Sequence, residues 1–120
     1  MPDLSTEDAK LVTLARAARA RTGAAEGAAV RDADGRTYAA ASVDLVSLRV
    51  SALRLCVAMA VSSGARPLDA AVVLTGATGL ADPDLAALRE VAAPGAVVRR
   101  GDAGGRLTES LPLDPQGPGA

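Results

Sequence analysis

Side chains able to do chemistry are few in this chain of 120 residues. Histidine is absent, which removes the commonest general base and the commonest metal ligand. Cys56 is the only cysteine, so no internal disulfide can form and a reducing compartment is expected. Because Cys56 lies within an apolar run, we interpret it as a small buried hydrophobic residue rather than a redox or metal-binding group.

Hydroxyls and carboxylates are the remaining candidates. Ser51 and residues 82–84 are each expected near the start of a helix, where the two helix N-termini converge. Such a place can bind an anion or a nucleotide without doing chemistry. The negative charges of Asp82 and Asp84 oppose a phosphate there, and we prefer the simpler interpretation that the caps satisfy the backbone N–H groups of their own helices.

Residues 48–64 are predicted to form a central helix, with Ser47 as the N-cap and Gly64 just past the end. Every residue from Leu55 to Val61 is apolar. A helix that lies on one core needs only one apolar stripe, so this helix is expected to be buried on more than one side. Either a second copy of the chain or the N-terminal helix provides the second cover.

The other elements complete an α/β fold. A first helix is capped by Ser5 or Thr6 and ended by Gly23, and a third helix has Asp82 as N-cap, Pro83 in its first turn and Pro94-Gly95 as its stop. Strands are expected at 27–31, 36–41, 70–74, 96–99 and 107–110, the first two joined by the tight turn Asp34-Gly35. This order predicts a three-layer α-β-α sandwich with a mixed sheet of four to five strands. Residues 1–111 are expected to form a single domain, and the Pro/Gly-rich residues 112–120 are expected to form a disordered tail.

Composition excludes several functional classes. The net charge is −1, from 13 basic and 14 acidic residues, and Tyr38 is the only aromatic residue, so a nucleic-acid surface is not expected. The acidic N-terminus is not a signal peptide. The longest uncharged run, residues 70–81, is too short to span a membrane. We therefore expect a soluble, cytoplasmic protein.

Four stretches, in order and with matching spacing, resemble the cytidine deaminase family. Residues 26–30 (Glu-Gly-Ala-Ala-Val) resemble its Val-Gly-Ala-Ala strand, and residues 34–38 its hairpin turn. Residues 42–44 (Ser-Val-Asp) fall where the family has Asn-Val/Ile-Glu, which binds the ribose. Residues 51–54 (Ser-Ala-Leu-Arg) fall where it has Cys-Ala-Glu-Arg or His-Ala-Glu, with the same spacing on to Gly64. The resemblance covers about residues 7–100 and implies a cytidine deaminase-like fold.

The family's chemistry depends on Zn²⁺, held by a Cys or His at the start of the central helix and by a Pro-Cys-x-x-Cys motif in the next helix. A Glu two residues after the first ligand moves the proton while zinc-bound hydroxide attacks the base. Ser51, Asp84 and Ala87 occupy the ligand positions here, and Leu53 occupies the Glu position. A catalytic zinc needs three protein ligands. We therefore predict no metal site, no zinc cofactor and no catalytic residue, with Ser42 and Asp44 as a vestigial substrate site.

The leading hypothesis is a zinc-less, catalytically inactive member of this fold with a binding or structural role. Family members pack their central helices together, so the resemblance implies a homo-oligomer, a dimer or tetramer, formed through the 48–64 helix. The alternative is a cytidine or nucleoside deaminase, a hydrolase acting on pyrimidine nucleosides. It would have to activate hydroxide with carboxylates such as Asp44, Asp82 or Asp84 alone. The sequence identifies no small-molecule ligand.

Overall fold

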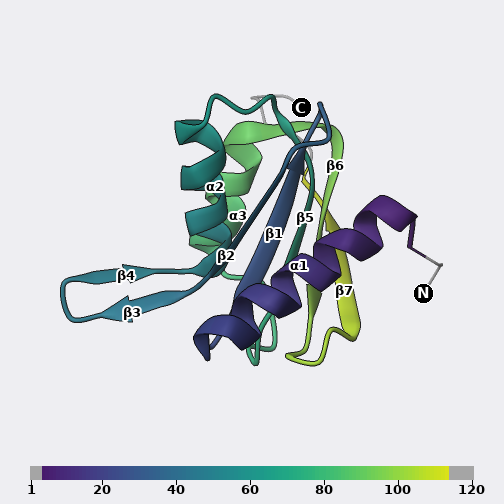
Figure 1. Ribbon diagram of the computed structural model, residues 1–120. Helices are drawn as coiled ribbons and strands as arrows, with labels where there is room; N and C mark the ends of the chain where they lie inside the picture. The colour runs from purple at the N-terminus through teal and green to yellow at the C-terminus, as the bar shows by residue number, and fades with distance from the viewer. Residues whose placement is uncertain (1–3, 114–120) are drawn as a thin grey trace.

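A five-stranded mixed sheet forms the middle layer of the structure, a computed structural model that describes residues 4–113 (Figure 1). The strand order is β2-β1-β5-β6-β7. Only β5 and β6 run parallel, and every other neighbouring pair is antiparallel. The strands are β1 (Gly27–Asp32), β2 (Thr37–Ala41), β5 (Leu68–Leu74), β6 (Ala92–Gly101) and β7 (Leu107–Pro112).

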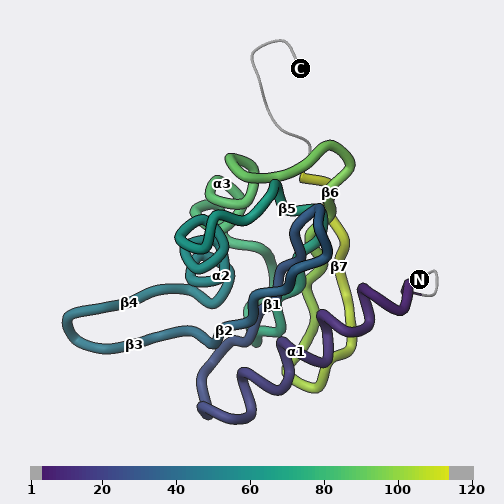
Figure 2. The backbone as a smooth tube through the Cα atoms, turned by 45° about the horizontal axis from the view of Figure 1, so that its top comes forward, coloured from purple at the N-terminus to yellow at the C-terminus, as the bar shows by residue number. Residues whose placement is uncertain are grey.

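Three helices cover the two faces of this sheet. They are α1 (Thr6–Thr22), α2 (Ala52–Ser62) and α3 (Asp82–Val91). Helix α1 lies on one face, and α2 and α3 lie side by side on the other (Figure 2). The predicted three-layer α-β-α sandwich with a mixed sheet is confirmed. No helix within residues 4–113 is long and apolar enough to cross a membrane.

Helix α1 begins and ends as the sequence predicts. The Ser5 side chain accepts a hydrogen bond from the backbone N–H of Asp8 at 3.0 Å, and Gly23 ends the helix with a left-handed φ of 67°. The helix crosses β1 closely at Gly27, where an added Cβ would lie 2.1 Å from the carbonyl oxygen of Ala15. Only glycine allows the helix and the strand to approach this far.

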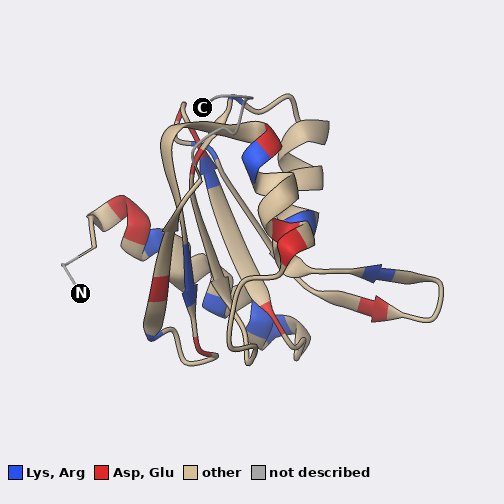
Figure 3. Cartoon of the chain, turned by 180° about the vertical axis from the view of Figure 1, so that it is seen from behind, with Lys and Arg blue, Asp and Glu red and all other residues tan. Residues whose placement is uncertain are grey.

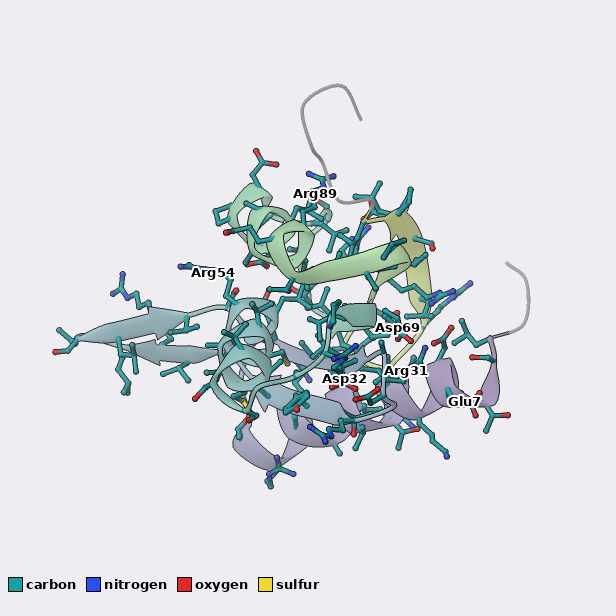
Figure 4. The ribbon with its side chains drawn as sticks, turned by 90° about the horizontal axis from the view of Figure 1, so that it is seen from above. Glu7, Arg31, Asp32, Arg54, Asp69 and Arg89 are labelled. Atoms are coloured by element: carbon teal, nitrogen blue, oxygen red, sulfur yellow. The ribbon has the colours of Figure 1, made fainter. Side chains whose placement is uncertain are left out.

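Half-buried charges hold the start of α1 against the sheet. The Asp8 carboxylate pairs with Arg31 on β1 at 3.0 Å and with Arg99 on β6 at 3.1 Å. Arg31 also lies beside Asp69 on β5, at 3.0 Å (Figure 4). The four charges link α1 to three strands in the middle of the sheet.

The apolar core is divided by the sheet into two parts. The core under α1 is small and rich in alanine: Leu11, Ala15, Ala29, Ala70, Val72 and Leu74. The larger core lies under α2 and α3 and includes Cys56, which is fully buried, as predicted. Burial raises the pKa of the Cys56 thiol to about 12. The thiol is therefore neutral and unreactive in the folded protein.

The central helix starts four residues later than predicted, because residues 43–50 form a hairpin. Strands β3 (Val43–Leu45) and β4 (Leu48–Val50) pair in a separate two-stranded sheet that projects from the body (Figure 1). Ser51, and not Ser47, is the N-cap, since its side chain accepts from the Arg54 N–H at 3.2 Å. Two serines four residues apart both precede apolar residues, and β-branched valines favour the extended conformation in this stretch.

The termini of α3 also differ from the prediction. Ala81 occupies the N-cap position and Asp82 is the first helical residue, with no side-chain cap. The helix ends at Val91, and β6 begins at the next residue. Pro94 and Gly95 therefore do not stop the helix but lie within β6, where its register with β5 shifts. Such an irregularity is where a strand tolerates proline.

The edge strand predicted at 107–110 is confirmed and extends to Pro112. Leu113, which follows it, is buried, and its N–H donates to the Ala96 carbonyl oxygen at 2.7 Å. The first two residues of the predicted tail thus belong to the folded part. The rest, residues 114–120, lie outside the described residues.

Candidate functional site

An open cleft of about 530 Å³ lies between the base of the β3–β4 hairpin and the ends of β1, β5 and α2. Its walls include three residues that the sequence singled out, Ser42, Asp44 and Ser51. They also include Glu26 and Thr75, which it did not. The fold therefore brings the expected substrate-binding and first-ligand positions to one open site.

Ser51 and Asp84 join the N-terminal turns of α2 and α3. The Ser51 hydroxyl donates to the Asp84 carboxylate at 2.6 Å while it accepts from the Arg54 N–H. Asp84 is only 6% exposed. The two helix starts converge, as predicted, and their facing side chains bind each other.

The other two positions carry no polar group. Leu53 is fully buried in the core under α2, where it can neither accept nor donate a proton. Ala87 is half-buried on α3. The Asp84 carboxylate and the Ser51 hydroxyl, which are hydrogen-bonded to each other, do not supply the three protein ligands of a catalytic zinc site. Within residues 4–113, no group of three or more Asp, Glu or Cys side chains gathers in a geometry that fits a metal ion.

Glu26 is the residue in the cleft that sequence reasoning missed. It directly precedes β1, and its carboxylate accepts from the Ala52 N–H at 3.3 Å and from the Thr75 hydroxyl at 3.1 Å. A negative charge at the first turn of α2 is favoured by the helix dipole. The available signal was a charged residue at the position where the resembling strand has valine.

Ser42 and Asp44 have local partners in the structure. The Ser42 hydroxyl accepts a hydrogen bond from the Glu26 backbone N–H at 3.1 Å. The backbone N–H of Ser42 donates to the Glu26 carbonyl oxygen. Asp44 forms an ion pair with Arg49 across the hairpin at 3.2 Å, with both side chains mostly exposed. An exposed pair of this kind contributes little stability. Asp44 is therefore the more accessible of the two at the cleft.

Several solved structures of cytidine deaminases align with this chain over most of its length. The structure of cytidine deaminase from Burkholderia pseudomallei aligns with a TM-score of 0.76 and 20% identity, over 92% of this chain and 94% of that chain. The enzyme from Mycobacterium leprae gives 0.65 and 18%, over 92% and 95%. The enzyme from Mycobacterium tuberculosis gives 0.63 and 24%, over 89% and 91%. These matches define the class of fold.

The family follows from the sequence itself. A family model described as cytidine deaminase-like matches residues 4–105, so the chain belongs to the cytidine deaminase-like family. No curated protein shows significant sequence similarity to it.

Proposed function

We propose that this protein is a catalytically inactive, zinc-free member of its family, with a binding or structural role as a cytoplasmic homo-oligomer. One observation carries the proposal: the hydrogen bond of 2.6 Å between Ser51 and Asp84. It joins the two helix starts at which the resemblance expects metal ligands. A site that is satisfied by its own side chains has no open position for a metal or for a metal-bound water.

The side chains at the cleft also support the proposal that the protein is catalytically inactive. Deamination by this fold needs a hydroxide made at neutral pH and a group that carries its proton to the base. Leu53 stands at the proton-transfer position and is buried. The Glu26 carboxylate also lines the cleft, but a carboxylate alone is far too weak a base to make hydroxide from water without a metal ion. The cleft retains room for a ligand while lacking the groups for hydrolysis.

Metal analysis and a turnover assay test the proposal directly. The protein is purified from cells grown with added zinc, its metal content is measured by mass spectrometry, and cytidine and deoxycytidine are followed by chromatography. We expect far less than one zinc per chain and no product above the background without protein. Stoichiometric zinc or turnover would overturn the proposal and favour the deaminase alternative.

Variants that restore the family's zinc ligands and proton-transfer residue make this test more specific. The variant Ser51→Cys/Leu53→Glu/Asp84→Cys/Ala87→Cys installs all three ligands and the proton shuttle. The matched control, Ser51→Cys/Asp84→Cys/Ala87→Cys, installs the ligands alone. We expect both folded variants to bind about one zinc per chain, because three thiolates at two helix starts suit the metal. Folded variants that bind none would contradict the assignment of these positions.

The proposal that the protein is a homo-oligomer is supported by exposed apolar side chains on the outer side of α2. Met59 and Val61 are 37% and 58% exposed, although they belong to the most apolar helix of the chain. Helix α1 packs on the opposite face of the sheet, so the idea that the N-terminal helix covers α2 is wrong. Light scattering is expected to give a mass of two or four chains of 11.9 kDa. A monomer at micromolar concentration would contradict this part of the proposal.

A further inference from the structure

A groove of about 280 Å³ lies at the C-terminal end of α2, away from the hairpin and the cleft (Figure 1). The last turns of α2 and α3 form two of its sides, and the loop that leads into β5 forms a third. Helix α2 carries no charge after Arg54, so the side that it provides is apolar (Figure 3). The groove and the cleft share no residue. The groove is therefore a second, separate cavity with an apolar lining that includes Ala60, Ala65, Leu68, Val91 and Ala92.

Two charges of opposite sign stand at the rim of this groove, Arg66 and Glu90. Both residues are exposed, and within residues 4–113 neither side chain forms an ion pair. They lie on neighbouring chain segments, because each precedes by two residues a member of the parallel pair Leu68 and Ala92. Paired strands lie about 4.8 Å apart. The rim thus offers a positive and a negative group that are close together and not bound to each other.

The backbone beside Arg66 is fixed by the turn between β1 and β2. The Arg66 N–H donates to the buried Asp32 carboxylate at 3.2 Å. The next carbonyl oxygen, that of Pro67, accepts from the Ala33 N–H at 2.9 Å. Because this wall of the groove is already ordered, only the Arg66 side chain has to lose freedom when a ligand binds.

The end of α3 presents acceptors beside Glu90. Within residues 4–113, no backbone N–H donates to the carbonyl oxygens of Arg89 and Glu90. A helix C-terminus of this kind carries a partial negative charge that favours a cation. The end of α2 differs, because its last carbonyl oxygens accept from the N–H groups of Ser63, Gly64 and Ala65. The groove therefore favours an ammonium group on its α3 side and a carboxylate at Arg66.

We propose that this groove binds an α-amino acid with an apolar side chain, such as leucine. The Arg66 guanidinium pairs with the α-carboxylate, and Glu90 and the end of α3 hold the α-ammonium group. The apolar side chain lies on Leu68 and Val91. The end of a peptide chain carries only one of these two charges, so a single amino acid matches the rim better than a peptide terminus does.

The size of the groove agrees with a small ligand. Pockets for drug-sized molecules measure about 300–1,000 Å³, and this groove is slightly smaller. The proposal goes beyond the proposed function, because it concerns a different cavity and depends neither on the loss of catalysis nor on the oligomer.

Titration of isotope-labelled full-length protein, followed by its amide NMR signals, locates the site. Leucine is the probe, and glycine, which has the same charges without the apolar group, is the control. We expect shifts at the groove and none at the cleft, with a dissociation constant of roughly 1 mM for leucine. Glycine should bind about tenfold more weakly, because it buries no apolar side chain. Absence of shifts at the groove, or equal binding of glycine, would overturn the proposal.

Two leucine analogues test the charges one at a time. Leucinamide lacks the carboxylate and N-acetylleucine lacks the ammonium group, so each should bind the wild type about tenfold more weakly than leucine. The variant Arg66→Gln should lose the preference for leucine over leucinamide and keep the preference over N-acetylleucine. The variant Glu90→Gln should show the reverse pattern. Arg21→Gln, an exposed position on α1, is the matched control and should keep both preferences.

Each outcome of these titrations decides the proposal. Thermal unfolding checks that the variants fold, as expected for substitutions of exposed side chains. Folded Arg66→Gln and Glu90→Gln variants that keep both preferences would overturn the assigned contacts. A wild type that binds N-acetylleucine as tightly as leucine would show a site for apolar carboxylates, such as peptide C-termini, and not for amino acids. An oligomer whose second copy covers the groove would give no shifts and would also overturn the proposal. The zinc, turnover and light-scattering measurements are independent of these results.

Discussion

Strand β1 has a carboxylate at each end, and the two are held in different ways. At its C-terminal end, Asp32 is fully buried, and its oxygens accept the backbone N–H groups of Asp34, Arg36 and Arg66 at 3.0, 2.9 and 3.2 Å. At the other end, Glu26 stands half-buried at the cleft.

The difference lies in what the partners can do. A backbone N–H can only donate, so all three partners of Asp32 require an acceptor. Glu26 has one such partner, the Ala52 N–H, while its other partner, the Thr75 hydroxyl, can reverse its role and accept. Asp32 is therefore fixed as a carboxylate by the fold. The charge of Glu26 is not required by its partners and is available to a ligand in the cleft.

The pKa of Asp32 reflects this fixation. Burial acts to raise the pKa of its carboxyl, but hydrogen bonds from the backbone of Arg36, Arg66 and Asp34, together with the charge of Arg36, lower it more. The result is a pKa below the ordinary value of 3.8. The folded protein thus stabilises the ionised form.

The largest effect is expected for Asp32→Asn. The amide group presents its own N–H to a backbone N–H that needs an acceptor, which leaves a buried donor unsatisfied. We expect a fall in the melting temperature of roughly 10 °C, because small domains shift by several degrees for each hydrogen bond of this kind. Calorimetry measures it, with the exposed neighbour substitution Asp34→Asn as the control. Equal melting temperatures for the two variants would contradict the role given to Asp32.

The loss of stability at acidic pH should also show the contribution of the Asp32 carboxylate. Since its folded pKa is lowered, the unfolded chain binds the proton first, and the stabilisation is complete above the unfolded value of about 3.8. It is lost as the pH falls through 3.8 towards the lower folded pKa. Denaturant unfolding between about pH 5 and pH 2 should show a steeper loss of stability in the wild type than in Asp32→Asn. Parallel curves would show that Asp32 does not contribute to the pH dependence.

The hydroxyl–carboxylate pair at the helix starts is expected to give an intermediate effect. Ser51→Ala removes the N-cap of α2 and leaves Asp84 without its donor, which costs about 2 kcal/mol. Asp84→Asn should cost less, because the Ser51 hydroxyl can reverse its role and accept from the amide. Urea unfolding compares the two variants. A larger loss for Asp84→Asn would show that the charge, and not the hydrogen bond, holds the helices together.

The smallest effect is expected at Glu26. The amide of Glu26→Gln accepts from the Ala52 N–H and donates to the Thr75 hydroxyl, so its stability should stay within about 0.5 kcal/mol of the wild type. Glu26→Ala, which loses both bonds, should cost about 1 kcal/mol. Urea unfolding of both variants measures the difference. A Glu26→Gln variant as unstable as Glu26→Ala would mean that the negative charge is structural after all.

The sequence predicted those features that local rules determine. Ser5, Gly23 and the Asp34-Gly35 turn act within a few residues, and the apolar run at 70–74, with its β-branched valines, favours a buried strand. The start of α2 was missed because Ser47 and Ser51 satisfy the same local rule. The choice between them depends on the pairing of β3 with β4.

At the candidate site too, contacts between distant segments could not be predicted from local rules. The sequence predicted that Ser51 and Asp84 meet, because the resemblance places both at helix starts. It did not predict Glu26, whose partners Ala52 and Thr75 lie 26 and 49 residues further along the chain. A hydrogen bond of that separation exists only after the sheet has formed. The one local signal, a charged residue where the resembling strand has valine, does not indicate which groups Glu26 contacts.

The glycine at position 27 fixes the thickness of the molecule on its α1 side. With the helix backbone resting on the strand, the layer between them has space for methyl groups and few larger side chains, which accounts for the alanines that fill it. A larger residue at 27 would lift the helix, and the small side chains below would no longer touch it. The buried alanines of this layer, Ala15, Ala29 and Ala70, thus follow from the absence of a Cβ at position 27.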